Sequence, residues 1–145
     1  MNWHARWMLP AAVLAAAVMA APSAPTQKAE EWGSVISNDG SWRVQWRVMM
    51  GAKQLSLPEV RKRFTIELRI ESLLEPKRPV RAVLVDAQMP DHVHGMNVAP
   101  TILMLEGGGA ASEGMLFHMS GRWEVDVDID DGETIERAQW DIGMY

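Results

Sequence analysis

The sequence predicts an all-β domain, specifically an immunoglobulin-like antiparallel β-sandwich of about seven strands, preceded by an N-terminal signal segment. Three observations lead to this fold class. Apolar and polar residues alternate with a period of two in successive stretches, turn residues separate these stretches, and no long segment has a helical period. The spacing between strands, about ten residues, is typical of a sandwich. A small antiparallel barrel is the alternative.

The N-terminal residues have the pattern of a secretory signal, and we place it at residues 1–20. Trp7 to Ala21 is an uncharged apolar run that is shorter than a membrane span, and Val18-Met19-Ala20 provides small residues for cleavage. An uncleaved anchor is the alternative. Residues 21–37 are then expected to form a flexible lead-in, and residues 38–145 the sandwich domain. This organisation predicts a periplasmic or secreted protein.

Three strands are expected in the first half of the domain, at residues 42–49, 64–71 and 80–88. The first two alternate apolar and polar residues and therefore predict half-buried strands. The third has the apolar centre Ala82-Val83-Leu84-Val85, which predicts burial on both faces. Residues 50–62 contain Gly51 and Pro58 and are expected to form a loop.

Four further strands are expected at residues 101–106, 114–119, 123–130 and 134–142. The glycine-rich stretch 107–112 predicts a flexible connection between the first two of them. Asp131-Gly132 predicts the hairpin turn between the last two. In residues 123–130 the aspartates alternate with apolar residues, which predicts a strand with a solvated acidic face.

A cluster of imidazole and thioether side chains stands out in the middle of the chain. Within the eight residues 89–96 lie Met89, His92, His94 and Met96. Side chains at i and i+2 of an extended segment point the same way, so His92 and His94 can direct their ring nitrogens at one ion. The two methionines lie on either side of this pair, and either thioether can serve as a further ligand. The loop has no obvious packing role, so we expect these residues to bind a metal.

His118 and Met119 are further candidate ligands on a later strand. Neighbouring residues of a strand point to opposite faces, so the two reach one site only if a bulge follows at Ser120-Gly121. Met115, Phe117 and Met119 share one face of this strand, which we interpret as core. A half-buried histidine bonded to the backbone would give the same sequence pattern as a ligand. Met49, Met50, Met104, Met115 and Met144 are expected in the core.

Copper, as Cu(I) or Cu(II), is the metal that best fits these ligands. Thioether and imidazole both bind copper, whereas calcium and magnesium require oxygen ligands and zinc usually takes a thiolate or carboxylate. The chain has no cysteine, which excludes disulfides, thiolate zinc sites, iron–sulfur clusters and the cysteine-ligated blue-copper centre. Asp91 is a candidate oxygen ligand or hydrogen-bond partner of a histidine. The acidic stretch from Asp126 lacks the glycine and glutamate of a calcium loop.

Charge and motifs exclude other classes of function. Residues 86–145 carry two basic side chains against twelve acidic ones, which favours cations and disfavours nucleic acid. Nucleophile-elbow, Walker and zinc-protease motifs are absent from the sequence, so no enzymatic activity is expected.

The two blocks Met89–Met96 and Met115–Trp123 resemble the YtkA-like/FixH-like family of exported bacterial domains. Members carry a Met-Pro-x-His-x-His-Gly-Met block and a later block that runs from Phe through His-Met to Pro-Gly-x-Trp. The resemblance implies an immunoglobulin-like domain outside the cytoplasm, and its matching positions are Met89, His92, His94, Met96, His118 and Met119. Ser120 stands where proline is usual in the family.

FixH-like relatives are associated with the assembly of copper-containing respiratory oxidases. The resemblance therefore implies a periplasmic copper-binding protein that works in copper delivery, oxidase assembly or copper homeostasis. Its partner would be a membrane-bound oxidase or a copper-acceptor protein. FixH itself has a membrane helix, whereas this sequence predicts only a signal segment. The alternative is a metal-free interaction module of a membrane-associated assembly, in which the methionine-rich loop packs on a partner subunit.

Overall fold

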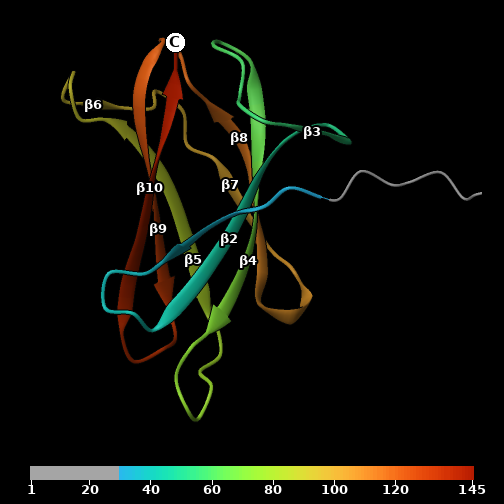
Figure 1. Cartoon of the computed structure of the whole chain (residues 1–145), viewed down its shortest axis with the longest axis vertical. Helices are drawn as coiled ribbons and strands as arrows, with labels where there is room; N and C mark the ends of the chain where they lie inside the picture. The colour runs from blue at the N-terminus through green and yellow to red at the C-terminus, as the bar shows by residue number, and fades with distance from the viewer. Residues whose placement is uncertain (1–29) are drawn as a thin grey trace, which may run out of the picture.

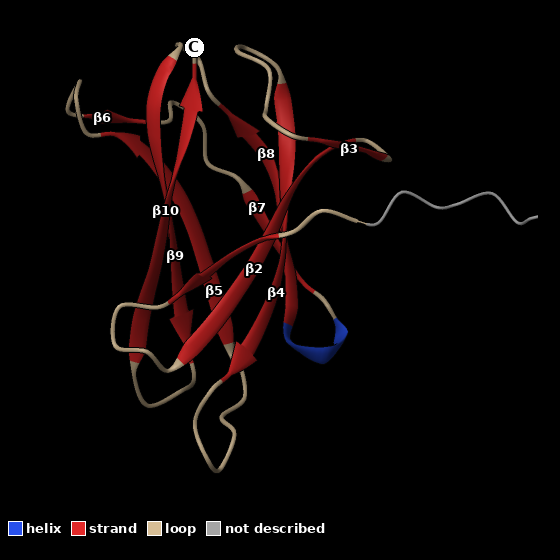
Figure 2. Ribbon diagram, in the orientation of Figure 1, coloured by secondary structure: helices blue, strands red, loops and turns tan. Residues whose placement is uncertain are grey.

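In a computed structural model, the structure describes residues 30–145, which form two antiparallel β-sheets packed face to face (Figures 1 and 2). The predicted all-β sandwich is therefore confirmed. The expected signal segment, residues 1–20, lies outside the described residues.

The first sheet has the strand order β1-β2-β4-β8-β7, and the short strand β3 also pairs with β2. The second sheet has the order β10-β9-β5-β6. The strand bounds in the first sheet are β1 Gly33–Ile36, β2 Trp42–Met50, β3 Lys53–Leu55, β4 Arg63–Ser72, β7 Thr101–Met104 and β8 Gly109–Leu116. The bounds in the second sheet are β5 Ala82–Met89, β6 His94–Gly95, β9 Gly121–Asp130 and β10 Ile135–Met144. A short 3-10 turn, η1, spans Glu106–Gly108.

This strand order is the immunoglobulin arrangement. Without the added strands β1 and β3, one sheet contains the first, second, fifth and fourth strands of an immunoglobulin-like sandwich, in the order β2-β4-β8-β7. The other sheet joins the last two strands to the third, and β6 extends its edge. The described strands form two separate sheets, so the barrel alternative is wrong.

The core lies between the sheets and follows the alternation in the sequence. Trp42, Val44 and Val48 point inward from β2, and Trp123 and Val125 point inward from β9. Burial of each large apolar side chain stabilises the fold by about 1.5–3 kcal/mol. The period-two pattern was therefore sufficient to locate these strands, since it records which side of each strand is removed from water.

The glycine-rich stretch 107–112 is not a flexible connection, as predicted, but the turn η1 followed by the start of β8. A Cβ on Gly108 would lie 2.9 Å from the Ile70 carbonyl oxygen, and one on Gly109 would lie 3.3 Å from the Leu68 carbonyl oxygen. The small residues here therefore allow β8 to approach β4 closely. Strand β8 ends at Leu116, and residues 117–120 form a loop instead of the predicted strand.

Several smaller predictions also need correction. The third predicted strand, β5, is buried on one face only, because Leu84 is 61% exposed. Met104 lies on the edge strand β7 and is exposed, and Met119 is also exposed, so neither belongs to the core. Strand β1 falls within the expected lead-in, residues 21–37, and pairs with β2. Residues 33–36 are therefore part of the folded domain.

The acidic face of β9 is less solvated than the sequence suggested. Asp126 is buried, and Asp128 lies beside it on the same face. Arg137 of β10 forms ion pairs with both carboxylates, at 3.5 Å to Asp126 and 2.6 Å to Asp128, and Gln139 donates a hydrogen bond to Asp126. Burial raises the pKa of Asp126 above its usual value. The pairs with Arg137 offset part of this cost of burying negative charge.

Asp131 fixes the turn between β9 and β10, and its removal is expected to give a pH-dependent loss of stability. Its carboxylate accepts hydrogen bonds from the Thr134 and Glu133 amides and pairs with Arg78, each at 2.8 Å. The Thr134 amide and then the Arg78 guanidinium hold the pKa of Asp131 well below its usual range. A carboxyl group whose pKa is lower in the folded than in the unfolded state stabilises the folded protein at pH values above its unfolded-state pKa, about 3.9. This stabilisation is lost as the pH falls further.

We therefore expect Asp131→Asn to lower the melting temperature at pH 7. The difference from the wild type should shrink as the pH falls below about 4. Thermal unfolding followed by circular dichroism between pH 7 and pH 2.5 measures this difference. A difference that stays constant across the range would contradict the assigned role of the charge.

Candidate metal site

The sequence-predicted ligands gather at one end of the sandwich. Strand β5 ends at Met89, the turn at residues 90–93 leads into β6, and the loop at residues 117–120 connects β8 to β9. Figure 1 places the β6 hairpin and the tip of β8 toward the same end of the molecule as the C-terminus. The fold therefore brings together two segments that lie more than twenty residues apart in the sequence.

Residues 90–93 form a tight turn and not the extended segment that the sequence predicted for His92 and His94. The Met89 carbonyl accepts hydrogen bonds from the amides of His92, at 3.0 Å, and Val93, at 2.9 Å. Val93 has a φ of 55°, a left-handed conformation that is costly for a β-branched residue. The reversal leaves His92 exposed in the turn and His94 half-buried on β6.

His94 lies directly opposite Met89 in the pairing of β5 with β6. Opposite residues of an antiparallel pair project to the same face with their Cβ atoms about 5 Å apart, so the imidazole and the thioether are neighbours. Met89 is fully buried, which places this face inside the sandwich. Met96, two residues after His94, packs against the core, and its amide donates to the Ala87 carbonyl at 3.1 Å.

The three imidazoles form a row with His94 in the middle. The ring centroids of His94 and His118 are 5.1 Å apart, and those of His92 and His94 are 5.9 Å apart. A metal–nitrogen bond of about 2.0 Å places the ion about 3.2 Å from the centroid of each imidazole that binds it. Two imidazoles on one ion therefore have centroids about 4.5–6.4 Å apart, depending on the angle between them. Both observed separations fall in this range.

Trp123 forms the floor of the row, a role that sequence reasoning missed. Its ring packs edge-on against His118, with ring centroids 5.4 Å apart, and against His94, with centroids 6.1 Å apart. It also stacks on Phe117, with centroids 4.5 Å apart. The indole N–H donates to the Met119 carbonyl at 3.0 Å. Trp123 therefore fixes both rings and the loop that carries His118. The only signal in the sequence was its position five residues after that histidine.

Two ring nitrogens have surroundings suited to metal binding. Nδ1 of His94 lies 3.2 Å from the Gly95 carbonyl oxygen, so in the neutral ring Nδ1 carries the proton and Nε2 has the free lone pair. Nδ1 of His118 is buried and has no hydrogen-bond partner in the structure. A buried polar atom without a partner is costly, and a ligand would remove that cost.

Asp91 pairs with Arg122 instead of a histidine. Its two carboxylate oxygens accept hydrogen bonds from the guanidinium at 3.2 and 3.3 Å. This hydrogen bonding lowers the pKa of Asp91 below its usual value. The pair connects the turn at residues 90–93 to the start of β9, so in this structure Asp91 holds the turn in position.

Among residues 30–145, no three or more His, Asp or Glu side chains are arranged to hold a metal ion together. The imidazoles of His94 and His118 lie close together, and Met89 is paired opposite His94 between β5 and β6. Met119 is 38% exposed on the loop next to His118. The structure thus brings Met89, His94 and His118 together, with the other three predicted ligands around them.

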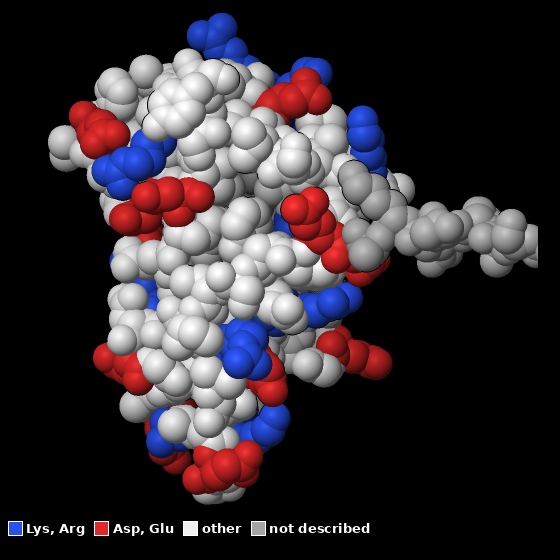
Figure 3. Space-filling model, viewed as in Figure 1, with Lys and Arg blue, Asp and Glu red and all other residues white. Residues whose placement is uncertain are grey.

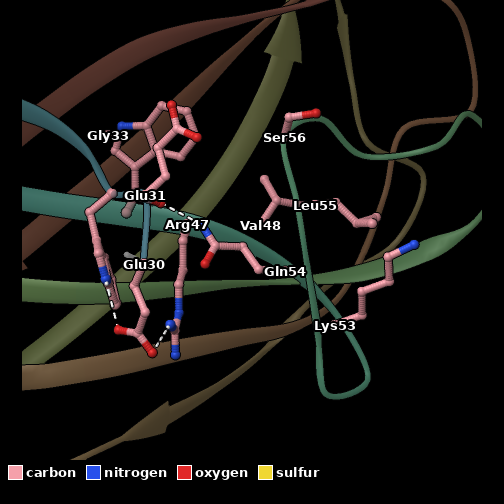
Figure 4. A pocket seen from close by; sticks show the side chains of 11 residues that line it. Glu30, Glu31, Gly33, Arg47, Val48, Lys53, Gln54, Leu55 and Ser56 are labelled. Atoms are coloured by element: carbon pink, nitrogen blue, oxygen red, sulfur yellow. Dashed lines mark hydrogen bonds and ion pairs between the residues drawn. The ribbon is translucent and has the colours of Figure 1, made fainter. Parts of the chain in front are cut away.

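A hollow of about 670 Å³ lies apart from the histidines, between the Glu30–Gly33 segment, β2 and β3 (Figure 4). Two of its charged groups, Glu30 and Arg47, pair with each other at 2.8 Å, and Glu30 also accepts a hydrogen bond from the Trp32 indole at 3.3 Å. The Trp32 ring also packs against the guanidinium groups of Arg47 and Arg69, at 4.6 and 3.9 Å from its centroid. We interpret these contacts as fixing β1 onto the sheet.

Comparisons of the chain with protein-family models, with curated proteins and with solved structures found no match. The resemblance of the two His/Met blocks to the YtkA-like/FixH-like family therefore stays an expectation from the sequence.

Gly121 supports Met89, and Gly121→Ala is expected to destabilise the protein by about 1–3 kcal/mol. Its φ of 128° lies in the region that favours glycine, and an added Cβ would lie 2.7 Å from the Met89 methyl carbon. Urea unfolding measures the loss. In the Met89→Ala background the same substitution should cost less, a partial recovery, because the shorter side chain makes room for the Cβ. No recovery would show that the backbone conformation alone sets the cost.

Proposed function

We propose that this chain is a copper-binding protein that holds one ion at the end of the sandwich. His94, His118 and Met89 form the centre of the site, and His92, Met96 and Met119 surround it. The row of imidazoles at 5.1 and 5.9 Å carries this proposal, because both separations suit rings that share one ion.

The ligand types support copper over other metals. Imidazole binds copper in both oxidation states, and thioether favours Cu(I). Asp91 is occupied by Arg122, so the nearest carboxylate is unavailable to a metal that prefers oxygen. The buried, unpartnered Nδ1 of His118 gives a ligand a further energetic advantage.

Work outside the cytoplasm, in copper delivery, oxidase assembly or copper homeostasis, is part of the same proposal. It rests on the expected signal segment and on the family resemblance. Within residues 30–145, no helix is long and apolar enough to cross a membrane. The partner would be a membrane-bound oxidase or a copper-acceptor protein, and the role is binding and transfer without catalysis.

A metal-free interaction module is the second candidate. The observation that favours it is the apolar tip of the β5–β6 turn, where Val93 is 92% exposed. Exposed apolar groups at a loop tip suit contact with a partner subunit. A partner that co-purifies equally well with and without a strong chelator would favour this candidate over copper transfer.

The copper proposal is tested by anaerobic titration of the purified chain with Cu(I) in competition with a chromophoric chelator. We expect about one copper per chain, and no retention of calcium or magnesium under the same conditions. If the chain releases all its copper to a weak competitor, the proposal is wrong.

Met119 is expected to contribute to Cu(I) affinity because it is exposed next to His118. Met119→Leu should weaken Cu(I) binding about tenfold and leave Cu(II) binding nearly unchanged, since thioether favours the reduced ion. Met104→Leu is the matched control, because Met104 is similarly exposed but lies on the edge strand β7 of the other sheet. Equal effects of the two substitutions would remove Met119 from the site.

A further inference from the structure

The loop between β3 and β4 presents apolar side chains to solvent at the same end of the molecule as the histidines. Leu57 is 49% exposed and Val60 is 37% exposed, and Tyr145 is fully exposed. These three residues line one open hollow together with Pro58, Glu59, Ser120 and Met144. The apolar side chains therefore form a single surface at the tip of the sandwich.

Basic side chains accompany this apolar surface. The loop and the first residue of β4, residues 56–63, contain three of them, Arg61, Lys62 and Arg63, against the single acidic residue Glu59. The whole chain has a net charge of -5, so the loop has the opposite sign to the rest of the protein. Figure 3 shows Lys and Arg side chains at the upper end of the molecule, with acidic side chains near them and side chains of both signs over the rest of this face.

Most of the positive charge in this loop is free to meet a partner. Glu59 pairs with Lys62. Across the described residues, no carboxylate forms an ion pair with Arg61 or Arg63. An unpaired cation interacts more strongly with an external anion than one whose charge is already balanced.

The loop is held in place by contacts with the segment that carries His118. The Arg61 amide donates to the Phe117 carbonyl at 2.8 Å, and its guanidinium donates to the His118 carbonyl at 3.4 Å. Arg63 donates to the Gly114 carbonyl at 2.9 Å. The apolar and basic groups are therefore presented by an ordered backbone and pay little ordering cost on binding.

We propose that this surface, named here the basic–apolar tip and formed by Leu57, Val60, Arg61, Lys62 and Tyr145, binds the surface of an anionic lipid bilayer. Apolar side chains flanked by cations are the chemistry of interfacial binding, in which the former enter the boundary between headgroups and acyl chains and the latter meet lipid phosphates. The acidic second sheet is repelled by the same surface, which orients the molecule with its tip toward the lipid. This inference stands independently of copper.

Binding to vesicles of a 1:1 mixture of phosphatidylglycerol and phosphatidylcholine, compared with phosphatidylcholine alone, tests the proposal by co-sedimentation. The chain starting at Ala21 is used, because it contains every described strand and lacks the apolar stretch before it. We expect binding to the anionic vesicles that weakens as salt is raised. Equal binding to both vesicle types, or none to either, would overturn the proposal.

Charge-matched variants locate the surface. Each basic residue near an anionic membrane contributes about fivefold in affinity, so Arg61→Glu/Lys62→Glu should weaken binding more than about 20-fold. Lys77→Glu/Arg81→Glu changes the net charge equally on the β4–β5 loop, at the opposite end of the molecule in Figure 1. This control should weaken binding less than about threefold. Equal losses in the two variants would show that net charge, and not the tip, governs binding.

Apolar variants test insertion in the same assay. Leu57→Ser/Val60→Ser should lose most of the binding that remains at high salt, because that part depends on burial of apolar surface. Leu84→Ser/Ile135→Ser is the control, since both residues are exposed apolar side chains of the second sheet. If the control loses as much, insertion by the tip is wrong. Unchanged circular dichroism spectra confirm that each variant is folded.

Discussion

Replacing His94 by alanine is expected to lower the copper affinity of this chain by more than about 100-fold. Loss of a residue that merely orients a ligand costs 10–100-fold, and loss of a central ligand costs at least as much. His94 is central because its ring lies next to both other imidazoles and opposite Met89. Competition with a chelator of known affinity, in both copper oxidation states, measures the change.

Two further variants make the His94 result specific. His118→Ala should also cause a large loss, whereas Asp91→Asn, on the same turn, should change affinity less than about fivefold because its carboxylate pairs with Arg122. A His94→Ala chain that keeps its full affinity would contradict the proposed site. A large loss of copper affinity in Asp91→Asn would instead show that this carboxylate is an oxygen ligand of the site.

Trp123→Ala is expected to destabilise the protein by about 3–5 kcal/mol, the range for removing a large buried aromatic side chain. Trp123 is fully buried, stacks on Phe117 and donates to the Met119 carbonyl. Its loss would also free the loop that carries His118. Urea unfolding of the metal-free protein gives the stability change without a contribution from bound copper.

Trp123→Phe separates the two roles of the indole. The phenyl ring keeps most of the apolar packing and lacks the hydrogen bond to Met119, so we expect a loss of about 1–2 kcal/mol. If Trp123→Ala lowers the free energy of unfolding by less than about 1 kcal/mol, the core and the loop that carries His118 do not depend on this residue.

The strands were predictable where burial is one-sided. β2, β4 and β9 alternate inward and outward residues along their length, so the sequence itself records their orientation. β5 alternates too, but the apolar and exposed Leu84 hides this in the sequence. Gly108 and Gly109 were predicted to form a flexible connection, but they allow the backbone to approach β4 closely. Glycine suits both situations, so the sequence alone does not distinguish them.

The composition of the candidate site was predictable and its geometry was not. Six ligand-type residues could be named from their chemistry, since imidazole and thioether are the neutral side chains that suit soft and borderline metals. The turn at residues 90–93 depends on a left-handed Val93, a conformation that valine rarely adopts and that no propensity suggests. The contact of Trp123 with both histidines depends on the packing of β9 beside β5, which is a long-range feature.

X-ray absorption spectroscopy at the copper edge of the loaded chain tests the central claim most directly. The proposed site predicts scattering from at least two imidazole rings and from one or more sulfur atoms, with the imidazole signal reduced in His92→Ala/His94→Ala. A spectrum with oxygen neighbours alone, or one that is the same in the wild type and the double variant, would contradict it.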